Sequence, residues 1–281
     1  MKTRIITGVC MFFAALPAFI FGKTALFVTV LALELVAVFE MLRCLGGAKT
    51  PALTLPSFLY AAAVPCGLFF VYGIAGRPVG CIVLISALTY FYVVAHLVLA
   101  TLSGGKVPVA LAAESAATVF YITVGFTGIV MTRLFPHGLF FLIMTVVIAF
   151  GTDTFAYFSG MLFGKHKLIP AVSPKKTVEG AIGGTLLSTL AFVGCGYLYA
   201  YLHPDVYVRL PALILCGFLL AIVSQLGDLV ASYIKRASGI KDYGGIFPGH
   251  GGVLDRFDSI IAVAPTMCIL LFIPGLFPIL S

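Results

Sequence analysis

Residues 224–259 read SQLGDLVASYIKRASGIKDYGGIFPGHGGVLDRFDS, beginning as an apolar helix and ending as a polar loop filled with glycine. Only 10% of the chain is charged, yet this stretch holds four of its ten acidic residues and four of its seventeen basic ones. They are Asp228, Asp242, Asp255 and Asp258, and Lys235, Arg236, Lys241 and Arg256. Charge so concentrated in an apolar chain indicates a site for a charged ligand.

The composition of the whole chain excludes an ordinary soluble protein. Hydrophobic residues make up 61% of the sequence and the mean hydropathy is +1.15. Apolar runs long enough to span a bilayer recur throughout, whereas the alternating pattern of a membrane β-barrel is absent. We therefore predict an all-α polytopic membrane protein. The seven cysteines include no CxxC pair, so buried reduced thiols are expected.

The hydropathy pattern predicts about nine transmembrane helices. Residues 1–22 also resemble a signal peptide, but another span follows at once, which favours an uncleaved first helix. We expect one integral membrane domain, residues 1–281, with N-terminal helices in 1–135 and the catalytic helices and loops in 136–281. The nine predicted spans are 5–22, 24–42, 53–75, 79–101, 108–132, 138–162, 180–202, 208–234 and 259–280.

The distribution of basic residues predicts the orientation. With nine alternating spans, thirteen of the seventeen Lys and Arg residues fall on the side of the N-terminus and four on the other. The positive-inside rule then places the N-terminus in the cytoplasm and the C-terminus outside. Because basic residues in a membrane protein mostly record topology, the net charge of +7 does not indicate nucleic acid binding, and no such partner is expected.

Several polar and small residues interrupt the apolar spans. Glu34 and Glu114 lie inside spans, where a carboxylate is costly; a structural, hydrogen-bonded place is favoured, and the sequence assigns them no role in chemistry. Asp153 also falls at membrane depth. Two GxxxG pairs, Gly160 with Gly164 and Gly180 with Gly184, predict close helix packing.

The loop FGKHKLIPAVSPKKTVEG, residues 163–180, is the first candidate for chemistry. Ser173 is a good N-cap and Pro174 a good first helical residue, which would place Lys175 and Lys176 in a first helical turn. Free backbone N–H groups beside two ammonium groups predict a phosphate site there. The alternative is a basic cytoplasmic loop that only obeys the charge rule, and no Walker A motif is present.

The opening stretch extends this interpretation. On a helix, Ser224, Asp228 and Ser232 share one face, and Asp228 needs a metal ion or a basic partner at that depth. The following glycines favour a backbone that wraps around phosphate oxygens. Asp255 and Asp258 suit helix capping when taken alone, and an isolated histidine such as His250 is more often a plain loop residue. Together, these features predict a Mg²⁺–nucleotide site, because Mg²⁺ favours one or two carboxylates plus substrate phosphates.

These motifs closely resemble the C-terminal signature of phosphatidate cytidylyltransferases, also called CDP-diacylglycerol synthases. The upstream FGKHK, SPKKTxEG and Gly227-Asp228 elements are similar to the family as well, so the resemblance covers residues 135–260. The signature residues are Ser232, Lys235-Arg236, Lys241-Asp242, His250-Gly251-Gly252, Asp255-Arg256 and Asp258.

The resemblance implies a reaction in which CTP and phosphatidate give CDP-diacylglycerol and pyrophosphate in phospholipid biosynthesis. It also implies a Mg²⁺ requirement, metal-binding roles for Asp228 and Asp255, and a homodimer. We expect Asp228, Asp255 and Asp258 to be catalytic, with Asp153 in support. Substrate binding is expected at Ser173, Lys175, Lys176, Ser232, Lys235, Arg236, Lys241, His250, Gly251, Gly252 and Arg256.

This interpretation places the protein in the cell membrane among its lipids, with a cytoplasm-facing site that receives CTP. A transporter remains an alternative, since intramembrane carboxylates also mark ion pathways, although no paired broken helices are visible. Another membrane enzyme that uses CTP, such as a polyprenol kinase or an archaeal-type CDP-lipid synthase, is a further alternative. An amino-alcohol phosphotransferase is disfavoured because its DGxxAR motif is missing.

Overall fold

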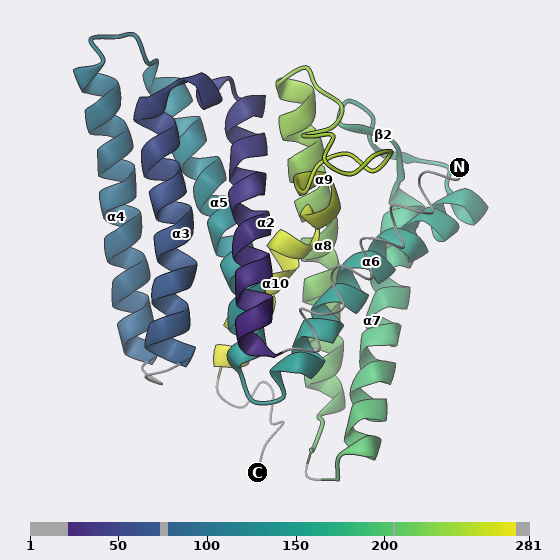
Figure 1. The fold of residues 1–281 in the computed structure, drawn as a ribbon. Coiled ribbons are helices and arrows are strands. Elements are labelled where there is room, and N and C mark those ends of the chain that lie inside the picture. Colours follow the sequence, from purple (N-terminus) through teal and green to yellow (C-terminus); the bar gives the residue numbers. More distant parts are fainter. Residues whose placement is uncertain (1–21, 74–77, 205, 274–281) are drawn as a thin grey trace. The chain divides into compact units, whose positions relative to one another are not determined.

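The computed structural model describes residues 22–73, 78–204 and 206–273 (Figure 1). Within these ranges the chain is mostly helical, and seven helices are long and apolar enough to cross a membrane. The α-helical polytopic class predicted from the sequence is thereby confirmed. The seven helices are α2 (Lys23–Cys44), α3 (Pro51–Gly73), α4 (Pro78–Leu102), α5 (Val109–Leu134), α6 (Gly138–Phe163), α7 (Val178–Leu202) and α8 (Leu210–Ala237).

The boundaries of these seven helices agree with the predicted spans to within three residues at each end. The first predicted span, 5–22, lies outside the described residues. The ninth corresponds to α10 (Ile260–Phe272), an apolar helix of 13 residues. It ends one residue before the last described residue, Ile273. Long apolar runs bounded by polar loops therefore located every described helix of spanning length.

The chain forms two compact units, and each is described by itself. The first comprises residues 1–136 and 237–257, and contains α2 to α5, the short 3₁₀ helix η1 (Gly47–Lys49) and α9 (Leu254–Phe257). Helix α3 packs against α4, and α2 packs against α5. The core includes Leu42, Ile122 and Phe126, and the Phe126 ring lies 5.4 Å from that of Phe257, which attaches α9 to the bundle.

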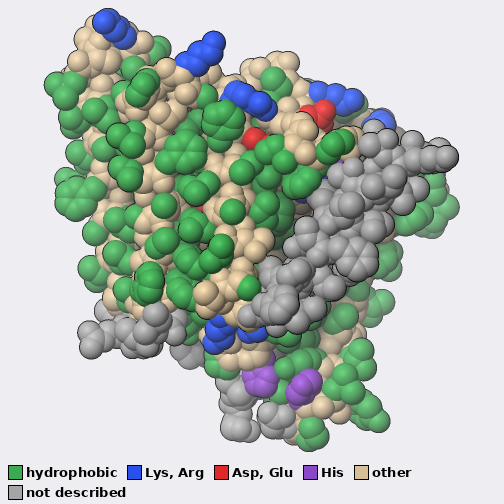
Figure 2. Space-filling view, viewed as in Figure 1, with side chains coloured by type: hydrophobic (Ala, Val, Ile, Leu, Met, Phe, Trp, Pro, Cys, Tyr) green, Lys and Arg blue, Asp and Glu red, His purple; other side chains and the backbone are tan. Residues whose placement is uncertain are grey.

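Polar side chains are unevenly distributed in the first unit. Glu34 is fully buried in α2, whereas Glu114 is exposed on α5. Ser57, Tyr92 and His96 form a buried hydrogen-bonded group between α3 and α4. The flanks of the helices instead carry exposed hydrophobic side chains, with lysine and arginine near helix ends (Figure 2). An apolar flank of this kind suits contact with lipid rather than water.

The second unit comprises residues 137–236 and 258–281, with α6, α7, α8 and α10. An antiparallel hairpin, β1 (Lys167–Ile169) and β2 (Ser173–Thr177), connects α6 to α7. These two helices pack closely through glycine: a Cβ atom on Gly180 would lie 2.7 Å from the Ala156 carbonyl oxygen, and one on Gly184 would lie 2.9 Å from that of Thr152. The close packing predicted from the GxxxG pairs is confirmed.

Gly184→Ala is expected to destabilise the second unit by about 1–3 kcal/mol, because the new methyl group has no room between α6 and α7. Thermal unfolding of the purified protein in detergent measures this effect. Gly194→Ala is the matched control on the same helix, since no atom lies within 4 Å of its Cβ position. Alanine favours a helix over glycine, so the control should not lower the midpoint. Equal midpoints for the two variants would contradict the packing argument.

Candidate active site

The loop between α6 and α7 differs from the sequence prediction. The prediction that Ser173 caps a helix with Pro174 in its first turn is wrong, because residues Ser173–Thr177 form a strand. Helix α7 begins at Val178, and the Thr177 side chain caps it by accepting a hydrogen bond from the Gly180 N–H at 3.1 Å. The chain reaches that capping position only after pairing β2 with β1, which keeps both lysines out of the helix.

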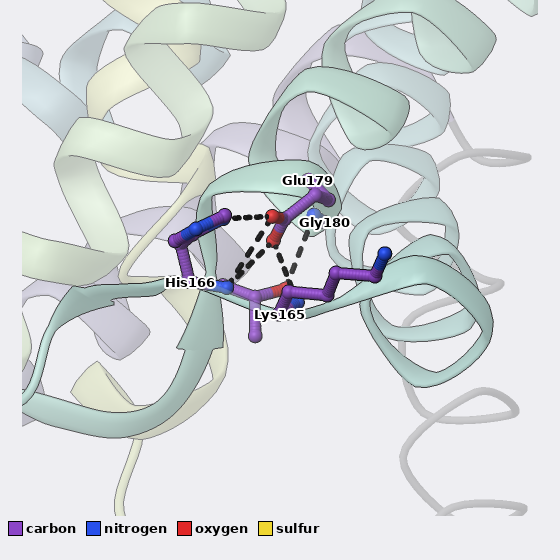
Figure 3. A network of polar contacts seen from close by, with 5 residues as sticks. Lys165, His166, Glu179 and Gly180 are labelled. Atoms are coloured by element: carbon purple, nitrogen blue, oxygen red, sulfur yellow. Dashed lines mark hydrogen bonds and ion pairs between the residues drawn. The ribbon is translucent and has the colours of Figure 1, made fainter.

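Glu179 in the first turn of α7 anchors the start of the hairpin (Figure 3). Its carboxylate accepts hydrogen bonds from the backbone N–H of Lys165 at 3.0 Å and of His166 at 3.2 Å. The His166 ring nitrogen Nδ1 lies 2.6 Å from Glu179 Oε1. A carboxylate in a first helical turn also suits the helix dipole. The strands that carry the basic residues are therefore fixed to the end of α7.

Lys176 of β2 and Asp228 of α8 form an ion pair within the second unit. The Lys176 ammonium is buried, whereas the neighbouring Lys175 is exposed, as expected for successive residues of a strand. The Ser232 hydroxyl lies 3.5 Å from Asp228 Oδ1, one helical turn further along α8. The basic partner that the sequence demanded for Asp228 is thus Lys176, and the predicted shared face of Asp228 and Ser232 is confirmed.

Two further carboxylates lie near this pair. The Ser259 hydroxyl donates to Asp153 Oδ2 at 3.4 Å, and the Ser259 backbone N–H donates to Asp258 Oδ1 at 2.8 Å. Burial, and after it the negative charge of Asp228, raise the pKa of Asp258 to about 7, although Lys235 opposes the shift. Three carboxylates thus share their surroundings with two lysines, which leaves the site short of positive charge.

A cavity of about 330 Å³ opens beside the ion pair. Its polar lining includes Asp153, Lys175, Lys176, Thr177 and Gln225, and its other walls come from α6 and α7. The Gln225 amide is held in place by donating to Thr185 Oγ1 at 2.8 Å and to the Ala181 carbonyl at 3.2 Å. The second unit therefore offers a small space with largely apolar walls and two lysines, which suits a phosphate group attached to an apolar body.

Asp255 lies in the first unit, in the first turn of α9, and is buried. Its Oδ2 accepts hydrogen bonds from the backbone N–H groups of Tyr243 at 2.8 Å and Gly252 at 2.9 Å, which closes the loop between them. Gly251 has a φ of +84°, and a Cβ atom there would lie 2.7 Å from the same carboxylate oxygen. Glycine is required at this position on both counts.

Glu40 is a functional candidate that the sequence reasoning missed. It is 2% exposed near the end of α2, and its carboxylate accepts hydrogen bonds from the backbone N–H groups of Val253 and Leu254. The sequence signal was an acidic residue three positions before Arg43, inside an apolar span. Because its partners lie more than two hundred residues away, that signal did not reveal what Glu40 holds.

The remaining predicted residues are placed as follows. Arg236, Lys241 and Arg256 are exposed, and Lys235 is half-buried. His250 is half-buried, and its Nδ1 has no hydrogen-bond partner among the described residues. The substrate-binding roles of Gly251 and Gly252 stay predictions, although the Gly252 N–H donates to Asp255.

No preformed cluster of protein ligands in the part of the chain described matches the metal site predicted from the sequence. No group of three or more His, Cys, Asp or Glu side chains has the arrangement of a metal centre there. Asp228 and Asp255 belong to different units and are each described within their own. Their assignment as metal ligands therefore stays a prediction.

Comparison with known proteins adds to this geometry. The family model described as "Cytidylyltransferase family" matches residues 2–274. The protein named phosphatidate cytidylyltransferase in Staphylococcus epidermidis is 35% identical over 271 residues, which cover 96% of this chain and 99% of that protein. The proteins of the same name in Staphylococcus haemolyticus and Staphylococcus aureus are 35% and 34% identical with the same coverage.

Proposed function

This chain belongs to the cytidylyltransferase family, and we propose that it transfers CMP from CTP to phosphatidate, giving CDP-diacylglycerol and pyrophosphate. The relatives that match it over 96% of its length carry the name of that enzyme. The observation that carries the proposal is the Lys176–Asp228 pair beside Asp153 and a cavity of about 330 Å³ with largely apolar walls. A basic group next to an apolar cavity in a membrane protein suits a lipid with a phosphate head.

The reaction needs positioning and charge more than proton transfer. An oxygen of the phosphatidate phosphomonoester is already ionised near neutral pH, so it attacks the α-phosphorus of CTP without a general base. The new P–O bond joins the lipid phosphate to CMP, and the bond from the α-phosphorus to the bridging oxygen breaks to release pyrophosphate. Catalysis then depends mainly on holding the phosphates and neutralising their charge. Lys176 and Lys175 serve this purpose at the cavity.

Mg²⁺ is the cofactor that we expect. Three carboxylates outnumber the two lysines around Asp228, which fits a divalent cation, and Mg²⁺ needs only one or two protein carboxylates when substrate phosphates supply the rest. Asp228 and Asp255 would hold it, with Asp258 and Asp153 in support. When bound, the ion would neutralise phosphate charge as the reaction proceeds.

We propose nine spans, with a cytoplasmic N-terminus and an external C-terminus. Two observations within the units support this topology. In the first unit, Arg43 and Glu40 near the end of α2 both bind the loop of residues 237–257, so that loop shares its side with Arg43. In the second, Lys176 of the hairpin pairs with Asp228 toward the end of α8 that carries Lys235 and Arg236. Within each unit taken by itself, the basic segments thus lie at the same end of that unit's helices.

This orientation gives the protein its place in the cell. We propose that it resides in the cell membrane as a homodimer, with the site open to cytoplasmic CTP and to phosphatidate in the bilayer. Both substrates then reach the site without crossing the membrane, since one is a soluble nucleotide and the other a membrane lipid. The N-terminal side carries the basic excess on which this orientation rests.

The direct test is a turnover assay with purified protein, labelled CTP, phosphatidate and Mg²⁺. The expected products are lipid-linked CMP and pyrophosphate in equal amounts, while CTP with a polyprenol in place of phosphatidate should give no phosphorylated polyprenol. No lipid-linked CMP under conditions where a Staphylococcus relative works would refute the proposal. Solute uptake into protein-bearing liposomes without CTP turnover would instead favour a transporter.

A further inference from the structure

We propose that Glu40 is a positioning residue for Asp255: from α2, its carboxylate holds the backbone segment from which Asp255 projects. The inference rests on the proposed function, in which Asp255 is a metal ligand. All of the residues on which it rests lie within the first unit. Both carboxylate oxygens of Glu40 accept hydrogen bonds from the loop backbone, so its effect on the reaction passes through Asp255.

The contacts of Glu40 are specific to one short segment. Glu40 Oε1 accepts a hydrogen bond from the Val253 N–H at 3.1 Å, and Oε2 accepts one from the Leu254 N–H at 3.0 Å. Both carboxylate oxygens are therefore used, and both partners directly precede Asp255. Hydrogen bonds from backbone N–H groups to an ionised carboxylate are about twice as strong as neutral ones. A buried carboxylate with two such bonds holds this segment in one place.

The loop leaves room for this carboxylate only because it carries glycine. A Cβ atom on Gly252 would lie 2.3 Å from Glu40 Oε1, and one on Gly244 would lie 2.1 Å from the same atom. Neither glycine has a positive φ, so backbone conformation does not explain why these positions lack a side chain. The close approach of Glu40 does explain it. Two of the loop glycines are therefore required by the close approach of a side chain from α2.

Two carboxylates together determine the path of the loop into α9. Glu40 binds the N–H groups of Val253 and Leu254, while Asp255 binds those of Tyr243 and Gly252. The Arg43 guanidinium, one turn after Glu40 on α2, donates to the Tyr243 carbonyl. Because α9 has only four residues, it has little stability of its own, and these contacts decide where Asp255 lies.

Glu40→Gln is the first test, since the amide keeps one acceptor oxygen but turns an NH₂ group toward a backbone N–H. Partners of this kind behind a metal ligand are typically worth about 10–100-fold in metal affinity or activity. We expect kcat to fall by about tenfold and the Mg²⁺ concentration for half-maximal activity to rise several-fold, with KM for phosphatidate unchanged. A general loss of folded protein would lower kcat without changing the Mg²⁺ dependence.

Hydrogen exchange supplies a readout that does not depend on activity. In Glu40→Gln, the amides of residues 252–254 should exchange faster than in the wild type, while those of α3 and α5 should not change. Glu34→Gln is the matched control, because Glu34 is equally buried on the same helix and makes no hydrogen bond to the loop. It should preserve the slow exchange of residues 252–254 and the Mg²⁺ dependence.

A double-mutant cycle tests the steric part of the inference. Gly252→Ala should strongly reduce activity and loop protection in the wild type, because its methyl group collides with the Glu40 carboxylate. In a Glu40→Ala background the same change should cost several-fold less. Additive effects in this cycle, or unchanged exchange and Mg²⁺ dependence in Glu40→Gln, would overturn the inference. A wild type that exchanges slowly at residues 252–254 but turns over no CTP would refute the proposed function and leave the anchoring by Glu40 intact.

Discussion

Asp255→Asn is expected to lower kcat by at least about a hundredfold while the protein stays folded and inserted in the membrane. Asparagine keeps a carbonyl oxygen that accepts from the N–H groups of Tyr243 and Gly252, so the loop retains both hydrogen bonds. The substitution removes only the negative charge that we propose for Mg²⁺ binding. Turnover of labelled CTP with phosphatidate, measured over a range of Mg²⁺ concentrations, gives the effect.

Glu114→Gln is the matched control for this prediction. Glu114 lies in the same unit and loses the same charge, but it is exposed on α5, outside the family signature, and no catalytic role is assigned to it. The control should change kcat by less than about threefold, because exposed charges contribute little. Near-full activity of Asp255→Asn would show that the charge of Asp255 is dispensable and would remove it from the proposed metal site.

Lys176→Gln has the second large expected effect, a loss of about a hundredfold in kcat/KM. The change removes the cation that pairs with Asp228. The carboxylates of Asp228, Asp153 and Asp258 then repel one another without that compensation. It also removes a positive charge from the lining of the cavity, where we expect a substrate phosphate. Steady-state kinetics with both substrates varied would show whether the loss lies in KM, in kcat or in both.

Lys167→Gln provides the comparison, since Lys167 pairs with Thr177 across the same hairpin but is exposed and lies away from the cavity. If a basic hairpin only recorded topology, the two variants would behave alike. A similar small loss in both would therefore support the alternative of a plain basic loop and contradict a role for Lys176 in the site.

The helices were predictable because membrane spans depend on composition over about twenty residues. The seven described helices of spanning length agree with apolar runs, and the need of Asp228 for a partner followed from its depth in α8. The identity of that partner did not follow. Lys176 was predicted to lie in a helical turn, and only the pairing of β2 with β1 aims it at Asp228.

The wrong helix start and the unforeseen contacts of Glu40 have a common physical cause. Ser173-Pro174 and Thr177 are both good helix starts, and local preference does not decide between them. The glycine loop gave a similar ambiguity, because a backbone free of side chains accommodates phosphate oxygens or carboxylate oxygens equally well. Here Glu40 and Asp255 accept from Gly252, Val253 and Leu254. Such long-range partners are not visible in a local pattern.

The capping hydroxyl of Thr177 has a consequence for how this sequence tolerates change in length. Thr177 is at once the last residue of β2, the cap of α7 and the side chain that fills the space above Gly160 and Gly164. Because Thr177 is fixed in place, the direction of each β2 side chain depends on how many residues separate it from Thr177. Inward and outward positions alternate along the strand. Gaining one residue just before Thr177 would exchange the inward place of Lys176 for an outward one, whereas an insertion of two residues would restore its inward place.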